Sequence, residues 1–141
     1  MVWHSEKVVG LDAAVEVLNR LFFRLESFQC VVLQPREGVA IKVFDKPWPS
    51  PIYVISGKLL PEDASRLLVT TQQLGLSAFD TTCAGDGSRG FSYSSLNQNL
   101  NVAETCRRIL QIFVDDSSTI AVHGVTGTVK VFPPDLEVGG Q

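Results

Sequence analysis

The sequence predicts an α+β fold in which helices cover an antiparallel sheet. Three stretches rich in β-branched and aromatic residues follow one another between residues 29 and 56, with the sequences QCVVLQ, VAIKVF and IYVIS. Such residues favour the pleated surface of a sheet, and turn sequences containing proline or glycine separate the stretches. Segments with apolar residues at helical spacing come before and after them. We therefore expect the order α-βββ-α-ββ-α-ββ, with mostly adjacent antiparallel pairs.

The first helix is expected from Asp12, a suitable N-cap, to about Leu25. Apolar residues recur there at helical spacing and form one face: Leu11, Val15, Leu18, Phe22 and Leu25. Phe23 stands in the middle of the opposite, polar arc, which amphipathic packing does not explain. We therefore place Phe23 among the candidate contacts to a partner or to a second subunit.

The first two strands are joined by Pro35 to Gly38, residues that suit a hairpin turn. Two registers remain open. A four-residue loop pairs Gln34 with Val39, whereas a shorter loop with Gly38 as a bulge shifts the facing pairs by one. The next connection, residues 45–51, holds three prolines and is expected to cross the surface as a stiff loop, with Trp48 at the edge of the sheet.

A second helix begins at Pro61, which suits the first helical position, and ends before Gly75, which suits the C-terminal cap. Its buried stripe is predicted to be Ala64, Leu67, Leu68 and Leu74. Residues 76–82 and 90–95 follow as two further strands around a glycine-rich loop.

A third helix is expected from Asn101, whose side chain caps it with Glu104 three residues later, to about Val114. Residues 119–123 and 128–132 then read as a closing hairpin around a loop at 124–127. Residues 133–141 have the composition of a flexible tail. We expect one domain over residues 1–132, with 133–141 as the tail.

Composition argues against several classes of partner. The 141 residues carry 12 basic and 15 acidic side chains, a formal net charge of -3, so no overall field attracts nucleic acid. Neither a signal sequence nor an apolar run of about 20 residues is present, so we expect no membrane contact. Cys30, Cys83 and Cys106 lie far apart, which suits buried free thiols in the cytoplasm.

The sharpest chemical motif is Asp80-Thr81-Thr82-Cys83-Ala84-Gly85-Asp86. It resembles the DTTGAGD anion-hole motif of the ribokinase-like sugar kinases, a resemblance that implies Asp86 as the catalytic base. In this sequence Cys83 replaces the first glycine, and turn and strand residues follow where that family has a helix. A small enzyme or ligand-binding protein with a phosphate or ion site at this loop is the alternative function, with Asp80, Cys83, Asp86 and Arg89 as its residues.

Histidine chemistry has no local support in the sequence. His4 and His123 lack a cysteine or an acid at metal-ligand spacing, so we expect no metal and no cofactor. A nucleophilic triad of Cys83, His123 and Asp115 or Asp116 has no flanking signature. His123 is therefore assigned to a turn at the end of a strand.

The order of elements up to the third helix resembles that of the type III secretion chaperones, small acidic proteins without catalytic apparatus. This resemblance implies a non-catalytic protein-interaction module, a small chaperone or assembly factor that acts as a dimer. Four apolar residues off the main faces of their elements are its candidate contacts: Phe23, Trp48, Val69 and Ile112. The expected partners are another protein and a second copy of the chain.

Overall fold

A computed structural model describes residues 1–45, 51–83, 85–94 and 101–126. The elements in chain order are β1 (Val2–Val9), α1 (Leu11–Phe22), β2 (Gln29–Arg36), β3 (Val39–Phe44), β4 (Ile52–Gly57), α2 (Pro61–Gln73), β5 (Ser77–Cys83), β6 (Arg89–Ser94), α3 (Val102–Leu110) and β7 (Thr119–Thr126). The mixed helix and sheet content that the sequence predicts is confirmed.

The strands form one sheet in the order β1-β7-β2-β3-β4-β6-β5, and each pair of neighbours is antiparallel. The three strands of residues 29–57 lie side by side at its centre. The hairpin of β5 and β6 extends the sheet on one side, while β7 joins on the other and carries β1 at the outer edge. The first and the last strands of the described residues, β1 and β7, are therefore neighbours in the sheet.

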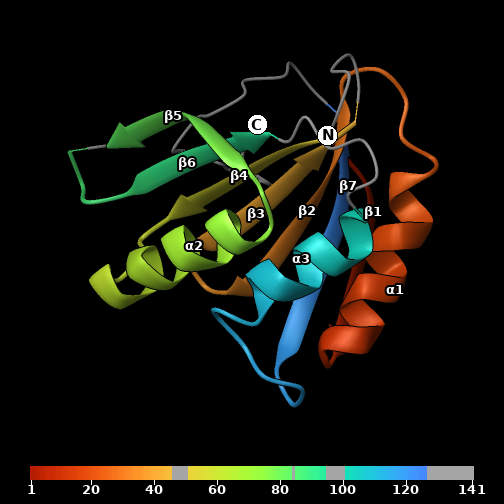
Figure 1. Ribbon diagram of the computed structural model, residues 1–141. Coiled ribbons are helices and arrows are strands. Elements are labelled where there is room, and N and C mark those ends of the chain that lie inside the picture. Colours follow the sequence, from red (N-terminus) through yellow and green to blue (C-terminus); the bar gives the residue numbers. More distant parts are fainter. Residues whose placement is uncertain (46–50, 84, 95–100, 127–141) are drawn as a thin grey trace.

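The three helices lie on the same face of the sheet (Figure 1). Alternate strand residues point to this face, because successive side chains of a strand point to opposite sides. They pack with the helices into the main core, whose largest fully buried side chains include Tyr53, Leu18, Leu21, Ile41 and Ile109. The other face carries a smaller buried apolar cluster: Cys30, Val32, Ala40, Phe44, Ile52 and Val54.

The two ends of the described chain differ from the expected order. Residues 2–9 form β1, which the prediction lacks because His4, Glu6 and Lys7 interrupt its apolar residues. Strand β7 runs through Gly124 to Thr126, where a turn was predicted, so that assignment is wrong. The strand predicted at 128–132 and the tail at 133–141 lie outside the described residues.

From Cys30 to Leu33, the hairpin of β2 and β3 has the second of the two registers left open, in which the facing pairs are shifted by one, but the bulge lies in β2 and not at Gly38. Arg36 pairs with Val39 across a two-residue turn, and an irregularity between Leu33 and Arg36 lets β2 continue through Pro35. Gly57 of the next strand lies against this turn. A Cβ on Gly57 would stand 1.8 Å from the carbonyl oxygen of Gly38, so only glycine fits there.

The helices lie close to their predicted positions but bury different residues in part. Helix α1 begins at Leu11 with Gly10 as N-cap, and it ends at Phe22, three residues earlier than expected. The predicted Asn101 cap of α3 is confirmed, since its side chain accepts a hydrogen bond from the Glu104 amide at 3.1 Å. In α2 the buried residues are Asp63, Leu67 and Thr71, whereas Leu68 is 57% exposed and does not belong to the buried stripe.

Candidate functional site

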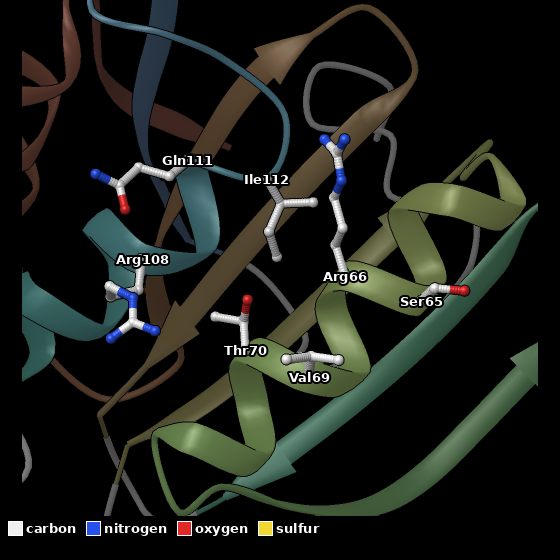
Figure 2. A pocket seen from close by; sticks show the side chains of 7 residues that line it. All are labelled: Ser65, Arg66, Val69, Thr70, Arg108, Gln111 and Ile112. Atoms are coloured by element: carbon white, nitrogen blue, oxygen red, sulfur yellow. The ribbon is translucent and has the colours of Figure 1, made fainter.

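Helices α2 and α3 enclose a groove of about 500 Å³ on the helical side of the molecule (Figure 2). One wall comes from α2, and the other comes from α3 and the two residues that follow it. The lining residues are Ser65, Arg66, Val69, Thr70, Arg108, Gln111 and Ile112. A concave surface with an apolar part and a few polar groups is the usual form of a binding site.

The groove wall on α2 is positioned by an ion pair at the start of that helix. Asp63 accepts hydrogen bonds from the Arg36 guanidinium and, at 3.1 Å, from the Leu60 amide, which would otherwise lack a partner at the helix end. The Asp63 side chain is only 5% exposed. The Arg36 guanidinium carbon also lies 5.3 Å from the centre of the Phe113 ring, just beyond α3. Arg36 thus connects the end of β2 to both helices of the groove.

The apolar part of the groove consists of Val69 and Ile112. Val69 is 53% exposed on the α2 wall, whereas Ile112 is 8% exposed and packs against the core. Both residues are interaction contacts predicted from the sequence, and the structure brings them into one groove. The other two proposed contacts lie elsewhere: Phe23 is 79% exposed at the C-cap of α1, and Trp48 is outside the described residues.

The charged part of the groove is basic. Arg66 comes from α2 and Arg108 from α3, and Ile112 and Thr70 lie between them in Figure 2. Arg108 donates a hydrogen bond to the amide oxygen of Gln73 at 2.7 Å. Within the described residues neither arginine forms an ion pair, and no acidic residue lines the groove. The groove therefore concentrates positive charge in a chain whose net charge is -3.

Arg107 differs from its neighbour Arg108 in its surroundings. Its guanidinium lies 2.5 Å from a carboxylate oxygen of Asp12 on α1 and 3.9 Å from one of Glu104. Arg107 thus joins α3 to α1, and only Arg108 is directed to the groove. The sequence alone does not tell which of the two arginines faces the groove, because the side of α3 that faces α2 depends on the packing of the whole core.

The residues of the alternative site at the Cys83–Gly90 loop are spread over the β5–β6 hairpin. Asp80 pairs with Ser92 and Cys83 with Arg89, so the side chains of Asp80 and Cys83 point to opposite faces of the sheet. Asp86 lies in the turn, where its carboxylate accepts a hydrogen bond from the Ser88 amide at 3.0 Å. This hydrogen bonding lowers the pKa of Asp86. In the described part of the chain, no group of three His, Cys, Asp or Glu side chains could hold a metal ion.

The imagined triad of Cys83, His123 and an acid does not form. His123 lies on β7 and Cys83 on β5, with four strands between them, which places them about 24 Å apart. The Asp115 carboxylate instead accepts hydrogen bonds from Ser117 and Ser118. Cys83 is exposed, contrary to the expectation of three buried thiols, whereas Cys30 and Cys106 are buried. Burial raises the pKa of Cys30 to about 11.

Comparison with known proteins identifies no relative: no protein-family model, no curated protein and no solved structure matches this chain. Among the described residues, no helix has the length and apolar character needed to cross a membrane.

Proposed function

We propose that this chain is a protein-interaction module that binds an acidic segment of a partner protein in the groove between α2 and α3, as a chaperone or assembly factor would. The observation that supports the proposal most is the half-exposed Val69 beside Ile112, flanked by two arginines without an ion pair among the described residues. An apolar anchor surrounded by polar groups is the usual composition of an interface core and its rim.

The charges of the groove select the class of partner. Arg66 and Arg108 present guanidinium groups, which bind carboxylates through paired hydrogen bonds. A ligand that places an apolar side chain against Val69 and Ile112, with a carboxylate on each side, would satisfy both features. A second copy of the chain would be a different occupant, and its presence there would count against an acidic segment.

The test is a peptide-display selection on the immobilised protein, followed by fluorescence anisotropy with the enriched peptides. We expect enrichment of sequences with acidic residues on both sides of an apolar one. Val69→Asp should weaken their binding at least tenfold, because it places a negative charge where the anchor sits. Phe23→Ser, which changes an exposed apolar residue away from the groove, should leave the affinity unchanged.

Two results would contradict the proposal. One is a set of peptides that bind the wild type and the Val69→Asp variant equally well. The other is a dimer, measured by light scattering at micromolar concentration, that Val69→Asp dissociates. Arg66→Gln with Arg108→Gln tests the charges separately. This double variant should bind the acidic peptides at least tenfold more weakly and should remove the salt dependence of binding.

A further inference from the structure

Ser5, His123 and Gln34 form a continuous hydrogen-bonded chain across three neighbouring strands. Ser5 of β1 lies opposite His123 of β7, with its hydroxyl oxygen 2.7 Å from His123 Nδ1. His123 Nε2 lies 2.9 Å from the side-chain oxygen of Gln34 on β2. This chain of residues is on the face of the sheet opposite the helices, since His123 lies opposite Val32 of the smaller apolar cluster. The residues are far apart in the sequence, so only the fold brings them together.

The partner of each ring nitrogen fixes the direction of the hydrogen bonds. An amide oxygen can only accept, so His123 Nε2 carries the proton that Gln34 accepts. Nδ1 then bears a lone pair and accepts the hydroxyl proton of Ser5. A hydroxyl bonded to a base that a third group orients is the arrangement by which proteins activate a serine.

The surroundings leave His123 able to accept a proton and Ser5 accessible to a small molecule. Burial and the nearby positive charge of Lys7 lower the pKa of His123, so the imidazole is neutral at pH 7 and can accept a proton. Ser5 itself is exposed on an edge strand, where a small molecule can reach its oxygen. Lys7 lies two residues further along the same face of β1, where its ammonium can stabilise negative charge on an attacked carbonyl oxygen.

We propose that Ser5 is a nucleophilic serine that takes an acyl group from small activated esters, with His123 as its base and Gln34 as a positioning residue. The Ser5 oxygen forms a bond to the ester carbonyl carbon while its proton passes to His123 Nδ1. The bond to the leaving group breaks, and the leaving alcohol takes the proton from His123. The product is an ester of Ser5. This reaction is independent of the groove between α2 and α3.

The test uses p-nitrophenyl acetate and follows acetylation of each residue by peptide mass spectrometry. Hydroxylamine removes an acetyl ester and leaves an acetyl amide, which separates Ser5 from the amines of Met1 and Lys7. Ser118 serves as an internal comparison, because its hydroxyl donates a hydrogen bond to the Asp115 carboxylate and, among the described residues, bonds to no histidine. We expect Ser5 to react at least tenfold faster than Ser118, and His123→Ala to reduce its rate to that of Ser118.

Gln34→Glu distinguishes a positioning role from a structural one. A carboxylate at this position would stabilise the imidazolium that forms as His123 takes the proton, so acetylation of Ser5 should become at least threefold faster. A variant that merely disturbed the sheet could not produce this gain. Equal rates at Ser5 and Ser118, or no increase with Gln34→Glu, would each overturn the proposal.

Discussion

Gly124 lacks a side chain because the indole of Trp3 occupies the space above it. A Cβ at this position would lie 2.5 Å from the Trp3 ring, closer than real contacts allow. Trp3 is the residue at which the register of β1 shifts against β7, and it packs on the main core. In sequence Gly124 resembles a turn residue. In the structure Gly124 belongs to β7, and the Trp3 ring packs against it.

Gly124→Ala should therefore lower the free energy of unfolding by about 1–3 kcal/mol, because the added methyl group overpacks the contact with Trp3. Urea denaturation measures the loss. Gly85→Ala is the control: no atom lies within 4 Å of a Cβ built on Gly85, so that substitution should change stability by less than about 0.5 kcal/mol. Equal stability of Gly124→Ala and the wild type would show that the indole does not define this position.

Helix α2 illustrates what could be predicted at the scale of an element. Pro61 and Gly75 mark its ends correctly, because the backbone preferences of proline and glycine depend on the residue itself and not on distant packing. Its buried face was predicted only in part, because Asp63 is buried by an ion pair with Arg36, a residue distant in the sequence. Val69 and Ile112 stood out as apolar residues off their main faces, yet Arg66, Thr70 and Gln111 carry no such signal.

Asp63→Ala should destabilise the protein by about 2–4 kcal/mol, since it removes the cap of α2 and leaves Arg36 without its buried partner. Glu62→Ala is the matched control, because Glu62 is exposed in the same helical turn. It should cost less than about 1 kcal/mol, the usual magnitude of a charge at a helix end. Thermal denaturation of both variants is the measurement, and similar losses would contradict a special role of Asp63.

The stability of the whole molecule depends on pH through titratable side chains in different elements. His123 has a lowered pKa in the folded state, so between that value and 6.5 the unfolded chain binds more protons. Stability should therefore rise with pH in this range and fall as the solution is acidified below about pH 6.5. The lowered pKa values of Asp86 and Asp115, caused by hydrogen bonds from Ser88 and Ser117, add a further loss below 3.8.

Urea midpoints measured from pH 5 to pH 8 test the contribution of His123 to the pH dependence of stability. His123→Asn should show a smaller slope than the wild type in this range, because the residue that takes up the proton is absent. An identical slope in the two proteins would assign the pH dependence to other groups. The loss of stability below pH 4, which comes from Asp86 and Asp115, should be the same in His123→Asn and in the wild type.

The pairing of β1 with β7 has a consequence for the order in which the chain acquires structure. The Thr126 amide donates to the Met1 carbonyl at 2.7 Å, and the facing residues of the two strands are more than 100 positions apart. At about 5–20 residues per second, ribosomes synthesise residue 126 roughly 6–25 s after residue 2. Throughout that interval residues 2–9 have no β7 to pair with, so this edge of the sheet cannot assemble until synthesis has passed Thr119–Thr126.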